Sequence, residues 1–454
     1  MIKKIIFLML LVIELFGCKP IKQLPPATFK QFPSSNKAYK PLNDLPCLAW
    51  WHQFHDQELN RLIKAALRNN MDIHIALGNI QQARGELLQV KLSWIPTIQL
   101  LAGYSTNPAL GVPGGFYGIW PYYALNIMKL YTQGKQASYN LQYYHAALDG
   151  ARLAVIGQVA SAYFTLMSQR EQIKLLRQLD NDLQTLIKLS THDVYIGLDN
   201  DLILAQLQSD ERLIAAQINP ILHNIVYSEN ALRFLINENP GKVHSKNNFA
   251  HLDFSRFRPG SLPATVLNHR PDMTMAIYAL KAARTGELVA WSDFFPYVQL
   301  DEFVGEIHLP KGQFANLTDA YADLDLIPSS IGNIMRSKGI TSTKFAALYK
   351  TIRQILREVD TDFSANKRMN EQFIMYSHAE ADYRHKYHLQ QSLLKTGLIS
   401  YKELLQSKLY LDSLALKTNQ AKLELAMSLV VLYEDLAGGY AYDKKQPINC
   451  CQMS

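Results

Sequence analysis

The chain contains few cysteines, and those few do not form pairs. Four Cys occur among 454 residues, and Cys47, Cys450 and Cys451 lie outside the N-terminal segment. Three thiols do not pair off completely, and adjacent cysteines form a bridge only with strain. This composition excludes a fold that depends on a disulfide framework.

Signature motifs of common enzymes are missing as well. The sequence has no Walker loop, no G-x-S-x-G elbow and no H-E-x-x-H pair. His52 and His55, like His385 and His388, are spaced so that each pair can share a helix face toward a metal ion. Neither pair has a Cys or a third ligand at motif spacing, so we interpret them as surface or interface residues. We predict no enzyme, no cofactor and no metal site.

Charge of either sign is not concentrated in blocks. The net charge of +7 arises from 46 Lys and Arg against 39 Asp and Glu, without a basic run or a basic stripe interleaved with aromatics. This distribution argues against nucleic-acid binding. A hydrophobic content of 48% is enough to bury a core.

The N-terminus has the pattern of a secretory signal peptide. Lys3 and Lys4 give a basic start, and the apolar stretch that follows is too short for a comfortable membrane span. It ends in the letters LFGC, which resemble the bacterial lipobox, whose Cys is lipidated and becomes the first mature residue. We predict a lipoprotein signal peptide over 1–17 and acyl chains, palmitate among them, on Cys18. An ordinary signal peptide that happens to end near a Cys is the alternative.

The segment after Cys18 predicts a tether to a membrane. Residues 18–49 carry six prolines among polar residues, a composition that favours an extended, lipid-anchored tether over a packed element. Lys19 occupies the position at which an Asp favours retention in the inner membrane, so we predict the bacterial outer membrane. Phe16 is bulkier than the usual lipobox residue, which bears on how efficiently Cys18 is lipidated.

The sequence repeats itself at an interval of 200 residues. WIPTIQL at 94–100 corresponds to FFPYVQL at 294–300, and Pro96 matches Pro296 within them. Gly197 and Gly397 match at the same offset. Two separated matches at one offset indicate an internal two-fold repeat. The predicted units are a first repeat over 50–241, a second over 262–440 and a C-terminal tail over 441–454.

Each repeat predicts a helix, two strands and paired long helices. Apolar residues recur at helical spacing from 58 to 90 and, much longer, from 136 to 238 and from 333 to 436. We expect these long helices to be interrupted near Gly197, Pro220 and Gly397. Alternation of apolar and polar residues predicts strands at about 98–106, 121–130, 298–307 and 319–327. Phe303 falls on the wrong face of its strand, which predicts a bulge or an early end.

Four strands are too few to close a barrel. Strands of about 9–11 residues cross a bilayer when tilted, and they need a closed barrel because lipid satisfies no exposed strand edge. Two chains would supply eight strands, whose interior is filled by side chains, and three would supply twelve, which leaves a channel. The fold class predicted is mainly α with a β-barrel contribution, in which a homotrimer shares one twelve-stranded barrel.

The sequence is similar to the outer-membrane efflux proteins, the TolC-like family, and to its lipoprotein branch in tripartite drug exporters. The resemblance runs in family order from Trp50 to Tyr440. Its stretches are AWWHQFHDQELNRLIKAALRNNMDIHIAL at 49–77, NALRFLINENPG at 230–241, LPATVLNHRPDMTMAIYAL at 262–280, FFPYVQL at 294–300 and LYEDLAGGY at 432–440.

This resemblance implies a passive, trimeric duct that exports small molecules such as drugs. It implies a barrel in the outer membrane that continues as a long periplasmic α-helical barrel, with a periplasmic adaptor and an inner-membrane pump as partners. It also implies a gate near the periplasmic tip, within GLISYKELLQSKLYL at 397–411. The gate residues implied are Tyr401, Lys402, Glu403 and Gln406. Gln406 occupies a position where an Asp is common in the family. The resemblance therefore does not imply that ion pairs close the gate.

Two alternatives stay open at this point. Lys402 and Glu403 are equally compatible with solvated positions on a helix surface. The whole chain is also compatible with a lipid-anchored periplasmic scaffold or adhesin that lacks a pore. In a barrel, aromatic residues of the strands would form girdles at the membrane interfaces. The candidates for such girdles are Tyr104, Trp120, Tyr122, Tyr123 and Tyr321.

Overall fold

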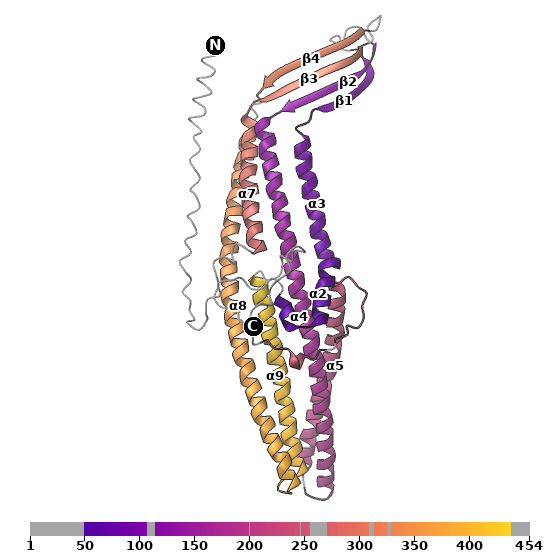
Figure 1. Cartoon of the computed structure of the whole chain (residues 1–454), viewed down its shortest axis with the longest axis vertical. Helices are drawn as coiled ribbons and strands as arrows, with labels where there is room; N and C mark the ends of the chain where they lie inside the picture. Colours follow the sequence, from indigo (N-terminus) through magenta and orange to yellow (C-terminus); the bar gives the residue numbers. More distant parts are fainter. Residues whose placement is uncertain are drawn as a thin grey trace. The chain divides into compact units, whose positions relative to one another are not determined.

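The computed structural model describes residues 50–106, 114–198, 200–245, 247–254, 270–307, 313–324 and 328–436 (Figure 1). All of them belong to one compact unit. The predicted signal peptide over 1–17, the lipid site Cys18, the tether over 18–49 and the tail over 441–454 lie outside the described residues.

The N-terminal helical segment is divided at Asn70. A short 3-10 helix, η1 (Trp50–Phe54), precedes α2 (Gln57–Asn69) and α3 (Met71–Leu92). The single helix predicted from 58 to 90 is therefore wrong. Asn70 has extended backbone angles, its side-chain oxygen accepts hydrogen bonds from Asp72 N and Ile73 N, and its amide donates to Leu235 O at 3.0 Å. Capping of the second helix by this side chain stabilises the break.

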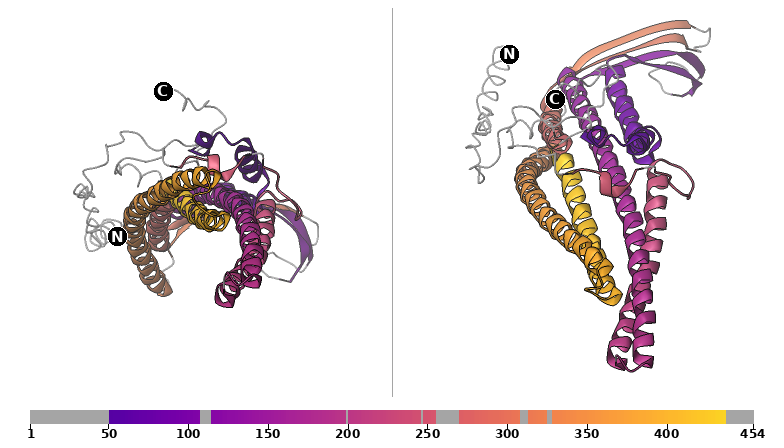
Figure 2. Two further views of the ribbon diagram at one scale, coloured as in Figure 1. Left: turned by 90° about the horizontal axis from the view of Figure 1, so that it is seen from below. Right: turned by 60° about the horizontal axis from the view of Figure 1, so that its bottom comes forward.

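Five further α-helices make up most of the residues that the structure describes. Within the compact unit α4 packs against α3, α5, α7 and α9, and α8 packs against α7 and α9 (Figures 1 and 2). At 1.5 Å per residue, the 69 residues of α4 span about 100 Å. The helices are α4 (Ile127–Tyr195), α5 (Asp201–Leu235), α7 (Pro271–Trp291), α8 (Ser329–Lys395) and α9 (Tyr401–Asp435).

Pro220 does not interrupt its helix, contrary to the prediction. It lies inside α5, which continues to Leu235. Proline removes one backbone hydrogen bond and crowds the preceding turn, and this costs about 3 kcal/mol in an exposed helix. Apolar packing against α4 holds α5 on both sides of the proline, through Ile214 before it and Leu232 after it, so the helix is kept.

The hydrophobic core lies where η1 and α2 meet the middle of α4 and the C-terminal half of α9. The Trp50 ring stacks on Tyr433 with centroids 4.9 Å apart. Phe54 contacts Phe164 at a centroid distance of 5.2 Å. Full burial of each such side chain contributes about 1.5–3 kcal/mol. The Tyr163 hydroxyl, buried beside them, donates a 2.6 Å hydrogen bond to an Asp56 carboxylate oxygen.

The four strands form one antiparallel sheet in the order β1-β2-β3-β4. Two of them lie earlier than predicted. The alternation at 121–130 continues into α4, whose N-cap is Asn126, and the strand predicted at 319–327 ends at Asp323, while 325–327 lie outside the described residues. The strands are β1 (Thr97–Ser105), β2 (Gly114–Leu125), β3 (Tyr297–Ile307) and β4 (Gln313–Asp323).

Phe303 does not cause the bulge that its position predicted. β3 pairs with β4 without interruption from Tyr297 to Ile307. Gly118 of β2 lies opposite Gly305 of β3, and the Phe303 ring covers this glycine pair. Ring atoms of Phe303 lie 2.8 Å from where a Cβ of Gly118 would stand and 2.9 Å from that of Gly305. The missing side chains make room for the ring, so the strand stays regular.

The register gives the sheet two different faces. We call one the apolar face, although Glu302 and Glu306 also lie on it; its exposed apolar members include Ile98, Leu100, Tyr104, Ile119, Val298, Leu300 and Phe314. We call the other the acidic face, because Asp301, Asp319 and Asp323 lie on it. Of the five girdle candidates, Tyr104 and Tyr123 lie on the apolar face, whereas the other three are on the acidic face. The five candidates for the girdles therefore do not share one face of the sheet, since neighbouring residues of a strand alternate in direction.

Candidate functional site

The two helical hairpins turn at the same end of the compact unit, at the bottom of Figure 1. Gly197 follows α4 with a φ of 77°, and Gly397 follows α8 with a φ of 73°. The amide of each glycine's successor, Leu198 or Leu398, donates back to a carbonyl of the last helical turn, at 2.8 and 3.0 Å. Glycine is favoured here because a Cβ strains this left-handed conformation. The predicted turn residues thus occupy equivalent turns.

Pro96 and Pro296 also occupy equivalent places. Each immediately precedes a strand, β1 or β3, after the helix α3 or α7 has ended. Proline restricts the residue before it to extended conformations, so these positions separate helix from strand. Whether the two halves descend from one duplicated unit stays a prediction.

The sequence-predicted gate residues all lie in the first two turns of α9. Tyr401, Glu403 and Gln406 are exposed, and Lys402 is half-buried. Ser400 and Glu403 form a capping box, in which Ser400 N donates to Glu403 Oε2 at 3.0 Å and Glu403 N donates to Ser400 Oγ at 3.2 Å. The carboxylate of Glu403 therefore caps its own helix.

Lys402 is paired with a residue that sequence reasoning missed. Its Nζ donates to Asp193 Oδ2, in the last turn of α4, at 3.0 Å. Both side chains are partly shielded from water, with exposed fractions of 24% and 29%. The pair joins the start of α9 to the end of α4, and so holds one hairpin against the other at the tip.

A second ion pair joins the same two helices further from the tip. Lys408 Nζ of α9 lies 2.6 Å from Asp182 Oδ2 of α4. Between the two ion pairs, Leu405 packs in a small buried cluster with Leu183 and Leu186. Apolar burial and two partly screened ion pairs thus act together to hold α9 against α4 at the tip.

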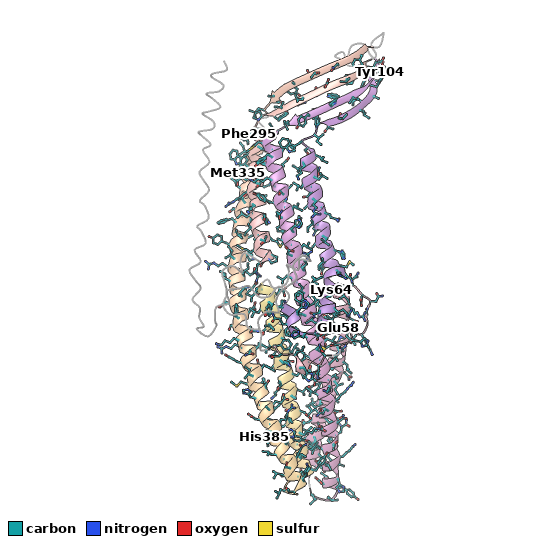
Figure 3. The ribbon with its side chains drawn as sticks, in the orientation of Figure 1. Glu58, Lys64, Tyr104, Phe295, Met335 and His385 are labelled. Carbon is teal, nitrogen blue, oxygen red and sulfur yellow. The ribbon has the colours of Figure 1, made fainter. Side chains whose placement is uncertain are left out.

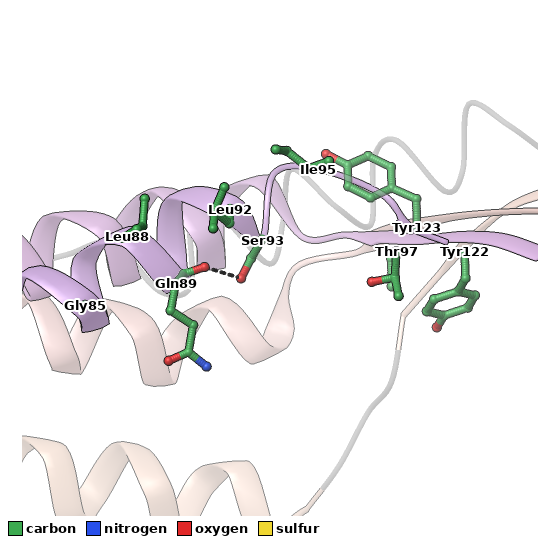
Figure 4. Close-up of a pocket in the computed structure, with 10 residues that line it drawn as sticks. Gly85, Leu88, Gln89, Leu92, Ser93, Ile95, Thr97, Tyr122 and Tyr123 are labelled. Carbon is green, nitrogen blue, oxygen red and sulfur yellow. Dashed lines mark hydrogen bonds between the residues drawn. The ribbon is translucent and has the colours of Figure 1, made fainter. Parts of the chain in front are cut away.

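A groove lies at the other end of the compact unit, where α3 meets β1 and β2 (Figure 4). It has a volume of about 560 Å³. The Tyr123 hydroxyl crosses its rim and donates to Trp94 O at 3.0 Å. None of the lining residues is charged. They are Gly85, Leu88, Gln89, Leu92, Ser93, Ile95, Thr97, Tyr122, Tyr123 and Ala124.

The histidine pairs do not gather further metal ligands among the described residues. His385 lies on α8 toward the tip (Figure 3), and His388 Nδ1 is 3.1 Å from Gln391 Oε1. His52 lies in η1, and burial lowers the pKa of its imidazole. In the part of the chain that the structure describes, no three His, Cys, Asp or Glu side chains come together as a metal site would require.

None of the described helices combines the length and the apolar composition that a membrane crossing requires.

Comparison with known proteins identifies relatives that span most of the chain. No family model matches. The solvent efflux pump outer membrane protein SrpC of Pseudomonas putida is 25% identical over 407 residues, which cover 86% of this chain and 87% of that protein. The probable outer membrane lipoprotein SilC of Salmonella typhimurium is 26% identical over 309 residues, or 63% of this chain and 64% of SilC.

The fold is shared with solved outer-membrane channels. The Campylobacter jejuni CmeC outer membrane channel matches with a TM-score of 0.77 and 19% identity, over 92% of this chain and 94% of CmeC. A likeness at this identity establishes the fold. Along most of its length the chain is similar to outer-membrane proteins of efflux pumps, and it has the fold of the TolC-like outer-membrane channels.

Proposed function

We propose that this chain is the outer-membrane channel of a tripartite efflux system, a passive gated duct that exports small molecules from the periplasm. The observation that carries the proposal is the four-stranded sheet, which has one apolar face, one acidic face and two outer strands. Relatives such as SrpC are named as outer-membrane proteins of efflux pumps. The chain catalyses no reaction, and the energy for export comes from the pump.

Three copies of the chain share one barrel. Within the described residues β1 and β4 each have one edge without a partner strand. An unpaired edge is costly in lipid, because every backbone amide and carbonyl there needs a hydrogen-bond partner. Pairing of β4 with β1 of the next copy removes all edges, and twelve strands leave an open lumen.

The two faces of the sheet fit this arrangement. Leu100, 81% exposed, and Phe314, 75% exposed, project from the apolar face and would contact lipid. The acidic face would line a water-filled lumen, where Asp301, Asp319 and Asp323 remain hydrated. The predicted lipid anchor on Cys18 adds a second attachment to the outer membrane.

The helical end of the trimer meets the other components. A periplasmic adaptor and an inner-membrane pump are the partners proposed, and the hairpin turns at Gly197 and Gly397 form the end that faces them. Tyr401, Lys402, Glu403 and Gln406, near this end, are the residues proposed for the gate. Lys402 acts in it through Asp193, as an ionic latch that keeps α9 against α4.

Conductance of the purified chain in planar lipid bilayers tests this function. We expect discrete channel openings for the wild type, and a severalfold higher mean conductance for Lys402→Ala, because loss of the Asp193 pair frees the start of α9. Lys417→Ala is the matched control, since this exposed lysine lies on the same helix above the tip. A chain that remains a soluble monomer and never conducts would instead fit the scaffold alternative.

A further inference from the structure

Two carboxyl groups face each other between α4 and α9, just above the tip. Asp412 of α9 is only 5% exposed, and the carboxyl group that acts on it most strongly is that of Asp182 of α4. Gln178 Nε2 donates to Asp412 Oδ1 at 3.4 Å. Lys408, one turn closer to the tip, pairs with Asp182.

The cation beside this pair does not balance the charges of both aspartates. Asp182 and Asp412 bring two negative charges when both are ionised, and Lys408 brings one positive charge. From α8, Arg384 is the remaining cation that acts on Asp412, and it is already paired with Glu380. The phenol of Tyr387 of α8 lies near Lys408.

The hydrogen bonding of Asp412 calls for a proton. Its Oδ2 is buried, and no residue that the structure describes donates a hydrogen bond to it. Two carboxylates in contact hydrogen-bond to each other only when one of them is protonated. Burial, the Asp182 hydrogen bond and repulsion by the Asp182 charge raise the pKa of Asp412 to about 7, although Lys408 and Arg384 oppose the shift.

We propose that a proton shared by Asp412 and Asp182 fastens the start of α9 to α4, so that the gate closes in acid and is released as the pH rises. The inference rests on the proposed function, because it adds proton control to the same gate. With the proton in place, the cluster holds one negative and one positive charge. Without it, two buried carboxylates repel each other across the interface between α4 and α9.

The direction of the pH dependence follows from the raised pKa of Asp412. An Asp that is released into water titrates near its ordinary pKa of about 3.9. Attachment of α9 to α4 is therefore strongest below that pH and weakens as the pH rises toward the pKa of the attached form. Between pH 5.5 and pH 8 we expect the equilibrium between attached and released α9 to shift by about tenfold or more toward release.

A second carboxyl pair provides an internal control. Asp362 of α8 contacts Asp435 at the far end of α9, and burial with this contact raises the pKa of Asp362 to about 7. Asp435 lies 23 residues beyond Asp412, a distance of about 35 Å along the helix. Asp362→Asn therefore removes a similar titration without altering the tip.

Bilayer conductance recorded from pH 5.5 to pH 8 tests the proposal. Wild type and Asp362→Asn are expected to open about tenfold more often at the alkaline end. The Asp412→Asn channel is expected to stay mostly closed at both ends of this pH range. The amide of Asn at this position donates a hydrogen bond to Asp182 and does not ionise. Asp182→Asn is also expected to lose most of the pH response. An undiminished response in Asp412→Asn would overturn the proposal.

Hydrogen–deuterium exchange of residues 401–416 gives a readout that does not depend on conduction. The ratio of exchange rates between wild type and Asp412→Asn cancels the intrinsic pH dependence of exchange. We expect this ratio to rise about tenfold from pH 5.5 to pH 8. A constant ratio would overturn the proton-controlled attachment even if the chain conducts, whereas a rising ratio without any conductance would contradict only the channel function.

Discussion

Arg270→Met is expected to destabilise the fold by about 3–5 kcal/mol, since it removes a buried cation that pairs with three partly exposed acids. The side chain of Arg270 is 10% exposed. Its guanidinium donates to both oxygens of Asp272 at 3.0 and 2.9 Å and to the Asp435 carbonyl at 2.9 Å. It also lies 3.2 Å from the Asp435 carboxylate and 3.4 Å from that of Glu358.

This one side chain ties together three helices. It lies at the start of α7, Glu358 lies in the middle of α8, and Asp435 ends α9. Without the guanidinium, the carboxylate of Asp272 can be solvated, because its side chain is 44% exposed. The carboxylate of Asp435 is left without a cation and largely without water, because its side chain is only 17% exposed. The charge of Arg270 also opposes the rise in the pKa of the Glu434 carboxyl, which burial raises to about 7. Breaking such a network costs more than forming it contributes.

Urea unfolding followed by circular dichroism measures the effect of Arg270→Met. Arg357→Met is the matched control, because Arg357 is 74% exposed and lies 3.9 Å from the same Glu358. An exposed pair of this kind contributes at most about 1 kcal/mol. Equal losses of unfolding free energy in the two variants would contradict the role given to the buried arginine.

Gly305→Ala is expected to prevent assembly of the sheet, at a cost of about 4 kcal/mol or more. A Cβ at this position would overlap the Tyr117 carbonyl oxygen and lie 2.6 Å from Gly118 Cα. Both neighbours are backbone atoms of β2, so relief requires the strands to separate. The Phe303 ring, 2.9 Å from the same point, blocks the other side.

The fraction of protein that resists dissociation in detergent gels measures this effect. We expect Gly305→Ala to lose nearly all of that fraction, since the shared barrel does not close without the contact between β2 and β3. Val304→Ala is the control, because it shortens a side chain on the opposite face of the same strand and adds no atom near β2. A wild-type level of resistant assembly in Gly305→Ala would show that the two strands are not closely paired there.

Turn residues were the part of the fold best predicted from sequence. Gly197 and Gly397 end α4 and α8 because only a residue without Cβ enters the left-handed region freely. Strand ends were poorly predicted. The alternating pattern of β2 runs on into Ile127 and Met128, and only the capping side chain of Asn126 shows where the helix begins.

The tip was located by resemblance, but its contacts were not. Lys402 was named without its partner, because Asp193 is 209 residues away in sequence. Local spacing does not reveal which distant residues come into contact. The role of Glu403 was readable, since Ser400-x-x-Glu403 is a capping-box pattern. The pair of Asp182 and Asp412 carries no sequence signal, because burial between two helices alone makes ordinary aspartates unusual.

The number of copies in the detergent-solubilised particle tests the central claim most directly. Native mass spectrometry of the purified full chain counts them without reference to any gate or partner. The unpaired edges of β1 and β4 predict three copies, each of which contributes four strands to one closed β-barrel. A particle of one copy, with both outer strands open to solvent, would contradict the account.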